Sequence, residues 1–246
     1  MFSIFVYFNF ELISYYIQIT YYKLTSKNGY VINKSFKIFI PENFNVHGID
    51  VSVHQSFIKW DEVTKMKVGH DSIDFVYIKA TEGKTHKDIF FKKNWIESKK
   101  NDLIRGAYHF YLPYLDGKSQ ADNFIGSVTL EKGDLPPVLD IEKRGKKNYK
   151  SFLKELKIWL TLVEKHYGVK PIIYTNLKFY EEYLNTEKLE GYTFWIAHYY
   201  VQELNSDSKW MFWQHNDRGC VSGINSLVDF NIFKGSLADL KKMTVK

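Results

Sequence analysis

The chain has 246 residues, of which 45% are hydrophobic and 25% charged, with 5 prolines and 14 glycines. This composition is typical of a folded globular protein and excludes a disordered or collagen-like chain. The single cysteine, Cys220, excludes an intrachain disulfide and a cysteine-based zinc site, and the net charge of +6 favours an anionic partner without selecting one.

Residues 1–45 precede the first regular unit of the predicted fold. The first 22 residues contain no Lys or Arg and are mostly apolar or aromatic, as in a membrane-anchoring segment. Glu11 lies near their middle and would cost roughly 2.5 to 3.5 kcal/mol at the centre of a bilayer. Two interpretations follow: the remnant of an N-terminal membrane tether, or an aromatic segment packed on the domain. Residues 23–45 are expected to form a linker with one short strand at 36–40.

From Val46 onward, short β-branched or aromatic runs alternate with helical patterns, which predicts βα units and a parallel sheet. The fourth helix has the clearest pattern, because apolar residues recur at spacings of three and four from Phe152 to Tyr167 and Gly168 supplies a stop. The five predicted strands are 47–51, 75–80, 104–111, 137–141 and 171–174, and the helices begin near Lys59, Lys87, Lys118, Tyr149 and Leu177.

After the fifth unit the pattern changes. Three further strands, at 194–199, 209–215 and 227–233, follow with no helix-length insert between them. Five βα units and three strands make eight strands, which suits a closed barrel. The predicted fold class is therefore α/β: an incomplete TIM-like barrel over residues 46–246 whose last third lacks its outer helices.

Four acidic residues lie near the ends of three predicted strands. Asp50 closes the first strand, Asp140 and Glu142 close the fourth, and Asp229 lies in the eighth. The reacting groups of such barrels lie at the C-terminal ends of the strands, so we expect these four acids on one rim. Asp140 and Glu142 should face the same side, with Cα atoms roughly 6.6 Å apart, and titrate as a coupled pair in which one carboxyl keeps its proton to higher pH.

A protonated carboxyl beside an ionised one is what cleavage of a glycosidic bond requires. Aromatic side chains on the same rim would then hold the sugar rings, in keeping with an aromatic share of 17%. The candidates are Tyr108, Tyr174, Trp195, Tyr199 and Trp213. The structural alternatives are a solvated strand end for the two acids and a place in the core for each aromatic residue.

Motifs of other function classes are missing from the sequence. It contains no Gly-x-Gly-x-x-Gly, His-Glu-x-x-His or Gly-x-Ser-x-Gly, and its eight histidines show no metal-ligand spacing. His109 is expected to be a hydrogen-bonded barrel residue. We therefore expect no metal and no cofactor, and no nucleic-acid partner, because no recognition motif accompanies the positive charge.

An ordered set of short motifs resembles glycoside hydrolase family 25, the Chalaropsis-type lysozymes or N-acetylmuramidases, from about Val46 to the C-terminal helix. Ser56 departs from the pattern, since the family commonly has glycine after the glutamine at this position. The motifs are His47-Gly48-Ile49-Asp50-Val51-Ser52 with Gln55 and Trp60, Phe75-Val76-Tyr77-Ile78-Lys79-Ala80-Thr81-Glu82-Gly83, Gly106-Ala107-Tyr108-His109-Phe110, Pro137-Val138-Leu139-Asp140-Ile141-Glu142, Ile173-Tyr174-Thr175, Trp195-Ile196-Ala197, Trp213-Gln214 and Val228-Asp229-Phe230-Asn231.

The resemblance implies hydrolysis of the β-1,4 bond between N-acetylmuramic acid and N-acetylglucosamine, so the expected partner is the peptidoglycan glycan strand. By motif position, Glu142 matches the general acid and Asp140 the residue that assists at the anomeric side. Asp50 and Asp229 match the flanking acids. A covalent carboxylate, an inverting water and the substrate's own acetamido oxygen all remain open, and we favour the acetamido oxygen, with Asp140 orienting it.

Two further residues in matching motifs, Lys79 and Gln214, complete the substrate-binding candidates. We also expect a monomer that is exported or membrane-anchored and acts in the cell envelope or outside the cell. A family 18 chitinase is disfavoured, because Leu135 and Val138 replace the first two acids of its motif. The alternative from another class is a catalytically silent peptidoglycan-binding module, against which the retained acid pair argues.

Overall fold

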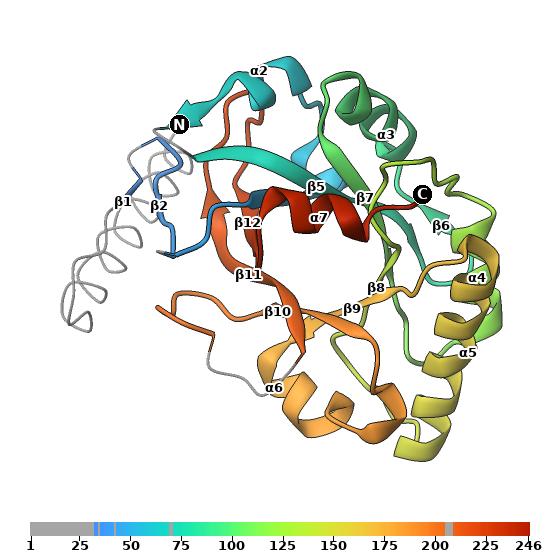
Figure 1. The fold of residues 1–246 in the computed structure, drawn as a ribbon. Helices are drawn as coiled ribbons and strands as arrows, with labels where there is room; N and C mark the ends of the chain where they lie inside the picture. Colours follow the sequence, from blue (N-terminus) through green and yellow to red (C-terminus); the bar gives the residue numbers. More distant parts are fainter. Residues whose placement is uncertain (1–31, 34, 42, 69–70, 205–208) are drawn as a thin grey trace, which may run out of the picture.

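The computed structural model describes residues 32–33, 35–41, 43–68, 71–204 and 209–246. Eight of its strands form a closed barrel in the order β3-β12-β11-β10-β9-β8-β7-β5, and pairing of β3 with β5 completes the ring (Figure 1). The predicted α/β barrel is therefore confirmed. Its strands are β3 (His47–Val51), β5 (Asp71–Glu82), β7 (Ile104–Phe110), β8 (Val138–Asp140), β9 (Ile172–Asn176), β10 (Thr193–Ala197), β11 (Trp210–Gly219) and β12 (Val228–Phe233).

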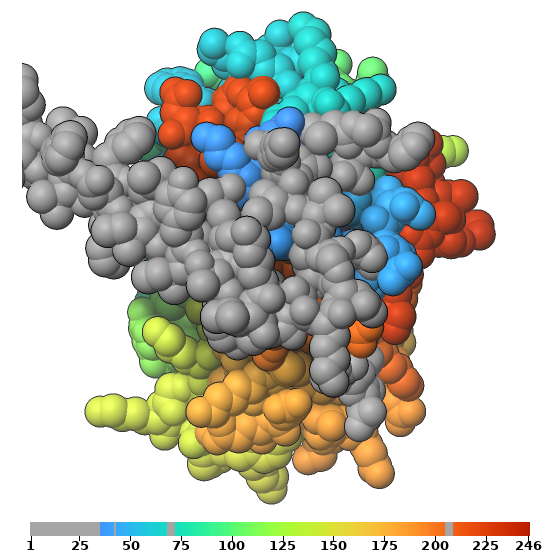
Figure 2. Space-filling view, turned by 90° about the vertical axis from the view of Figure 1, so that its left-hand side faces the viewer, coloured from blue at the N-terminus to red at the C-terminus, as the bar shows by residue number. Residues whose placement is uncertain are grey.

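Helical segments follow the first five barrel strands, as the sequence predicts. The segments after β3 and β9 lie at opposite ends of the molecule, with α2 at the top in cyan and α6 at the bottom in light orange (Figure 2). No helix lies among the described residues between β10 and β12. The helices are α2 (Trp60–Lys65), α3 (Phe91–Lys100), α4 (Gly117–Ile125), α5 (Tyr149–Tyr167), α6 (Leu177–Phe179), which continues into a π-helical turn (Tyr180–Leu184), and α7 (Leu237–Met243).

Short elements complete the described fold. Two of the two-residue strands pair with each other in a separate sheet, two others each pair with β5, and two 3₁₀ turns lie in the loops. They are β1 (Ile32–Asn33), β2 (Ile38–Phe39), β4 (Lys67–Val68), β6 (His86–Lys87), η1 (Val53–Gln55) and η3 (Glu187–Leu189).

Strand β12 runs antiparallel to both of its neighbours, whereas the other pairings around the barrel are parallel. Its register with β3 places Asp229 directly opposite Asp50. Residues that face each other across antiparallel strands have side chains close together, and like charges there repel. The topology thus creates a carboxyl pair from two strands that are far apart in the sequence.

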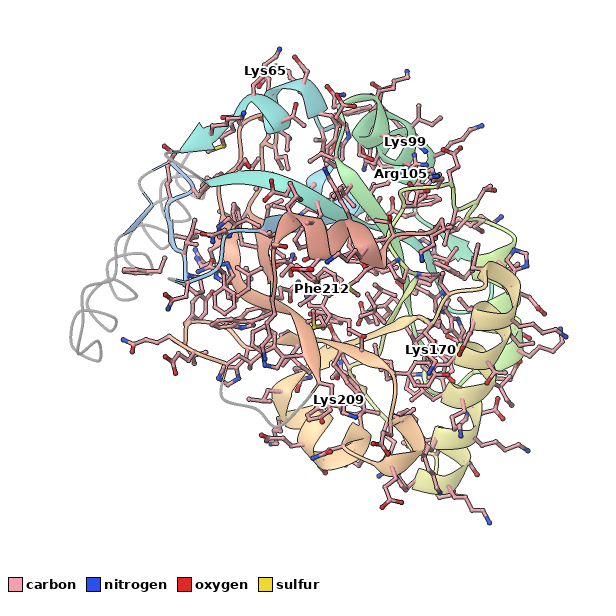
Figure 3. All side chains as sticks on the ribbon, in the orientation of Figure 1. Lys65, Lys99, Arg105, Lys170, Lys209 and Phe212 are labelled. Carbon is pink, nitrogen blue, oxygen red and sulfur yellow. The ribbon has the colours of Figure 1, made fainter. Side chains whose placement is uncertain are left out.

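Aromatic side chains fill the interior of the barrel. Phe75, Tyr77 and Phe212 are fully buried and contact one another, and Phe212 lies near the middle of the barrel, whereas Lys65 lies at the periphery (Figure 3). Gly106 leaves room for this packing, because a Cβ there would lie 2.2 Å from the Tyr77 ring. A second apolar layer lies between the barrel wall and the outer helices.

Helix α7 covers the N-terminal end of the barrel, across which it runs in Figure 1. Its Leu240 is fully buried among the interior side chains. The chain after α7 is held by two backbone hydrogen bonds, one from Gly133 N to Val245 O and one from Val245 N to Asp134 O. With this end closed, the open end of the barrel is the one at which the parallel strands finish.

Residues 35–41 lie against the barrel. The Phe36 ring is fully buried 5.0 Å from that of Phe230, and Cys220 N donates to Phe36 O. The strand predicted at 36–40 is β2, which is shorter. The aromatic segment predicted as a tether or a packed segment falls on residues 1–31, outside the described residues. Within the described part of the chain, no helix combines the length and apolar character that a bilayer crossing needs.

Ser56, the departure from the family pattern, has a strained backbone with φ of 54° and ψ of −131°. Glycine adopts such angles at little cost, whereas other residues lose roughly 1 to 3 kcal/mol. We expect Ser56→Gly to raise the free energy of unfolding, measured by urea denaturation, by about 1 kcal/mol. Ser151→Gly, in the regular helix α5, should instead lower it by about 0.5 to 1 kcal/mol. Equal losses in both variants would contradict the strain at Ser56.

Candidate active site

A cavity of about 400 Å³ opens at the C-terminal end of the barrel. We call it the catalytic cavity, and its walls come from loops and strand ends of most of the barrel. The structure brings together there the four acids singled out from the sequence: Asp50, Asp140, Glu142 and Asp229. Lys79, Tyr108, Tyr174, Trp195, Tyr199 and Gln214 line it as well.

Asp50 is held by two amide side chains from the neighbouring part of the barrel. Gln214 Nε2 and Asn231 Nδ2 both donate to Asp50 Oδ2, at 2.7 and 2.8 Å. Gln214 Oε1 in turn accepts hydrogen bonds from the hydroxyls of Tyr174 and Tyr199, at 2.7 and 2.6 Å. Each member thereby fixes the orientation of the next, so the network presents one defined Asp50 carboxyl to the cavity.

Trp195 forms part of the cavity floor and extends this network. Its indole Nε1 donates to Asn231 Oδ1 at 2.8 Å, and its ring packs edge-on against Tyr174 with centroids 4.8 Å apart. Only 2% of Trp195 is exposed, so it presents a small accessible surface to a ligand and also packs in the core.

Asp50 and Asp229 differ in their pKa values and therefore in their ionisation at neutral pH. Burial raises the pKa of Asp50 to about 6, against the opposing effect of the hydrogen bonds from Asn231 and Gln214. Burial, followed by the charges of Asp50 and Asp217, raises the pKa of Asp229 to about 9. At neutral pH Asp50 is therefore mainly ionised while Asp229 holds a proton, which relieves the repulsion between the facing carboxyls.

Asp140 and Glu142 form the second carboxyl pair. Both line the catalytic cavity, whereas Ile141 between them is buried in the outer apolar layer, as the alternation of a strand predicts. Burial, and then the charges of Glu142 and Asp50, raise the pKa of Asp140 well above its ordinary value. Burial also raises the pKa of Glu142, although Lys143 and Lys79 oppose this. The pair thus keeps a proton to higher pH than separate carboxyls would, and the more deeply buried Asp140 holds it more strongly.

Asp140 also carries an unsatisfied acceptor. Its Oδ1 is buried and has no hydrogen-bond partner among the described residues. An unpaired buried oxygen costs roughly 1 to 3 kcal/mol, and such atoms in native proteins usually have a task. A ligand that brings an N–H or O–H into the cavity would supply the missing donor.

Lys79 supplies positive charge to the catalytic cavity. Its Nζ lies 2.7 Å from Glu82 Oε2 and 4.9 Å from the centre of the Phe110 ring. The Lys79 charge lowers the pKa values of both Asp140 and Glu142 and so limits the effect of burial on them.

Trp213 is the predicted site residue that the structure places elsewhere. Its side chain is fully buried in the outer apolar layer, beside Phe44 and Trp210, and does not line the catalytic cavity. The reason is the alternation along β11: Phe212 and Gln214 face the barrel interior, so Trp213 faces outward. Its indole Nε1 donates to His198 O at 2.8 Å, which is a structural task.

Asn231 and Asp217 belong to the site but were not among the site residues predicted from the sequence. Asn231, which binds Asp50, lies two positions after Asp229 and therefore on the same face of its strand, a signal that was available. Asp217 lines the cavity from β11, where two register shifts alter the alternation, and no sequence signal marks it.

His109 is a hydrogen-bonded residue of the barrel, as the sequence predicts. His109 lies outside the barrel wall, where Nδ1 is 2.7 Å from Thr81 Oγ1 and Nε2 is 3.4 Å from Gln120 Oε1, and its ring stacks on Trp159. Within the described ranges, no three His, Cys, Asp or Glu side chains are arranged to hold a metal ion.

Asp229→Asn is expected to stabilise the protein as the pH rises. The folded protein keeps the Asp229 proton up to about pH 9, whereas the unfolded chain releases it near the ordinary value of 3.8, so the wild type loses stability over this range. Asparagine imitates the protonated form and removes the loss. We expect a gain of about 1 to 2 kcal/mol in the free energy of unfolding at about pH 7.5, and little change at about pH 4, by urea denaturation.

Asp239→Asn is the control, because it is expected to change the free energy of unfolding in the opposite direction. Hydrogen bonds from Lys242 and Ser236 lower the pKa of Asp239 to about 2, so this exposed residue contributes stability that is present above the ordinary pKa and lost below it. Its asparagine variant should be less stable than the wild type at neutral pH. A destabilised Asp229→Asn protein at neutral pH would contradict the protonated state of Asp229.

Comparison with known proteins agrees with this geometry. The model of the family described as glycosyl hydrolases family 25 matches residues 49–224. YegX of Escherichia coli K12, described as uncharacterized, is 45% identical over 214 residues, which cover 87% of this chain and 78% of YegX. Lysozyme M1 of Streptomyces globisporus is 34% identical over 212 residues, covering 79% of this chain and 70% of that protein.

A solved structure shares the fold. It is the family 25 glycosyl hydrolase from Bacillus anthracis, which has a TM-score of 0.75 and 30% identity and covers 89% of this chain and 99% of that chain. The family match extends over most of the barrel and includes Asp50, Asp140 and Glu142. The chain therefore belongs to glycosyl hydrolases family 25 and is a glycoside hydrolase.

Proposed function

We propose that the protein hydrolyses peptidoglycan at the β-1,4 bond between N-acetylmuramic acid and N-acetylglucosamine. The observation that carries the proposal is the Asp140–Glu142 pair, two carboxyls with raised pKa values in one cavity. The relatives named Lysozyme M1, from Streptomyces globisporus, and Autolytic lysozyme, from Clostridium acetobutylicum, support this substrate.

In the proposed reaction Glu142 is the general acid. Its proton passes to the bridging oxygen as the bond from that oxygen to the anomeric carbon breaks. The acetamido oxygen of the same sugar attacks the anomeric carbon and forms a cyclic oxazolinium ion. Water then adds to that carbon and gives one proton to the Glu142 carboxylate, which restores the acid and leaves a retained anomer.

Asp140 is proposed to orient the acetamido group. Its unpaired Oδ1 would accept a hydrogen bond from the acetamido N–H, and this bond favours the ionised form of Asp140. The proton that Asp140 holds in the free protein would then reside on Glu142, where the reaction needs it. Asp50 and Asp229 are proposed to flank the positive charge that develops at the sugar carbon, with Asp50 as the ionised partner.

The remaining roles stay proposals too. Lys79, Tyr108, Tyr174, Trp195, Tyr199 and Gln214 are proposed to contact the glycan. We also propose that the protein acts as a monomer in the cell envelope or outside the cell, and the N-terminal tether remains a prediction.

Product analysis tests the proposed bond. The protein would be incubated with peptidoglycan, and the new reducing ends would be reduced with borohydride and identified by mass spectrometry. Muramitol ends support the proposal, and glucosaminitol ends would refute the choice of bond. Binding to peptidoglycan without new ends would instead favour the silent binding module.

A further inference from the structure

Exposed apolar side chains form a patch on two loops, one that follows β3 and one that precedes α3. Phe57 is 65% exposed and Ile89 is 76% exposed, although both are large and apolar. The rings of Phe57 and Phe90 pack edge-on, with their centroids 5.0 Å apart. We call Phe57, Ile89, Phe90 and Lys93 the rim patch. Exposed apolar surface that is gathered in this way marks a contact with a ligand or partner.

Lys93 gives the rim patch a positive charge. Its Nζ lies 4.4 Å from the centre of the Phe57 ring, and it forms no ion pair with an acidic residue in the described part of the chain. The one acid between residues 84 and 93, Asp88, is buried. Three further lysines of this segment are exposed: Lys84, Lys87 and Lys92. The patch therefore combines apolar surface with cations that are available to an anionic ligand.

The two loops that carry the rim patch are held together by the carboxyl group of Asp88. Its Oδ2 accepts a hydrogen bond from Val53 N at 2.7 Å, and its Oδ1 accepts one from Phe90 N at 2.9 Å. The first loop is also tied to the barrel, because Gln55 Nε2 donates to Leu227 O at 3.1 Å. Loops that are fixed before binding lose little conformational freedom when a ligand arrives.

The rim patch adjoins the catalytic cavity. His54 and Gln55 line that cavity, and Phe57 follows two residues after Gln55. Between them lies Ser56, whose strained backbone was described above. Strained residues cluster at ligand-binding sites in native proteins. A molecule that extends out of the cavity past His54 would next contact the rim patch.

We infer that the rim patch binds the peptide stem of peptidoglycan, the short peptide joined to the lactyl group of N-acetylmuramic acid. The inference rests on the proposed function, because the muramic acid bound in the catalytic cavity would bring the stem to the rim. Peptide stems carry alanine methyl groups and free carboxylates. The methyl groups would pack on Phe57 and Ile89, and a carboxylate would pair with Lys93.

An anionic membrane is another partner for a surface of apolar and basic side chains. The rim patch lies beside the opening of the catalytic cavity, so a membrane bound there would cover the opening that has to admit the glycan. A peptide attached to the bound sugar has the opposite effect, because it adds contacts to the substrate. The position of the patch therefore favours the stem.

Two substrates that differ only in the peptide test the inference. One is a preparation of uncrosslinked glycan strands that carry their stems, and the other is the same strands after an N-acetylmuramyl-L-alanine amidase has removed the stems. Both substrates reach the catalytic cavity, and only the first reaches the rim patch. The measurement is the stem ratio, which is kcat/KM on the strands with stems divided by kcat/KM on the strands without them.

We expect Phe57→Ala to lower the stem ratio roughly 5-fold, the effect of losing one aromatic contact. Ile89→Ser should lower it as well. Lys93→Gln should lower it at low salt and have little effect at about 1 M salt, where charges are screened over about 3 Å. Because Phe57, Ile89 and Lys93 are exposed, the three variants should fold normally, which circular dichroism checks.

Two control variants make the same kinds of change far from the rim patch. Leu237→Ala removes an exposed apolar side chain at the start of α7, which covers the opposite end of the barrel. Lys157→Gln removes an exposed lysine of α5. Both controls should keep the wild-type stem ratio.

A wild-type stem ratio in both Phe57→Ala and Lys93→Gln would overturn the inference, while cleavage of the stem-free strands would leave the proposed function standing. Binding to phosphatidylglycerol vesicles that is lost in Phe57→Ala, with an unchanged stem ratio, would assign the patch to a membrane and overturn the inference too. A folded wild-type protein that cleaves neither substrate would refute the proposed function and the inference with it.

Discussion

Glu142→Gln is expected to lower kcat on peptidoglycan about 10²- to 10⁴-fold, the range for loss of a general acid. The glutamine amide has nearly the same shape but cannot give a proton to the leaving oxygen. No hydrogen bond from another described residue is among the interactions that set the pKa of Glu142, so the fold should survive the change. The rate of new reducing ends measures the loss, and circular dichroism checks the fold.

A second substrate, the β-fluoride of N-acetylglucosaminyl-N-acetylmuramic acid, makes this prediction specific, because its leaving group is one atom. Fluoride departs with little need for protonation, so Glu142→Gln should retain far more of its activity on the fluoride than on the glycan. Glu187→Gln makes the same chemical change at an exposed position of η3 and should leave both activities intact. Equal losses of the Glu142 variant on both substrates would refute its role as the acid.

Asp140→Asn should lower kcat about 10²- to 10³-fold, because the uncharged amide orients the attacking acetamido group less strongly than a carboxylate does. In contrast to Glu142→Gln, we expect the same loss on the fluoride, since Asp140 acts on the attacked sugar and not on the leaving group. The measurement is again kcat on the two substrates.

A stability measurement accompanies the Asp140 prediction. The substitution removes a buried carboxyl with an unpaired oxygen, so the free energy of unfolding should not fall. Asp102→Asn, at an exposed position after α3, is the matched control and should change neither rate nor stability. A selective loss on the glycan alone would move Asp140 to the leaving-group side and contradict the proposal.

The barrel and its acids follow from local patterns in the sequence. The strands alternate apolar and polar faces and the helices repeat every three to four residues, so the order of elements and the place of Asp50 and Asp140 at strand ends were predictable. Strand β5 is longer than predicted, because it begins at Asp71 and pairs with β4.

For Trp213, the residue type alone predicts the wrong location. Its aromatic side chain predicts a sugar-binding residue, but its neighbours Phe212 and Gln214 face inward and so fix it outward. The same alternation would have found Asn231. Both predictions improve when each residue is assigned to one face of its strand by the alternation of side chains.

The order of the pKa values of Asp140 and Glu142 was not predictable in this way. The difference between the two residues comes from their degree of burial, which is set by tertiary contacts and not by their spacing.

Asp140 and Glu142 share one cavity and should titrate as a coupled pair, which carboxyl ¹³C NMR titration of the free protein can measure. Both residues should titrate above their ordinary pKa values, and Glu142→Gln should lower the pKa of Asp140 by removing the nearby charge. Two carboxyls that titrate independently at ordinary values would contradict the account.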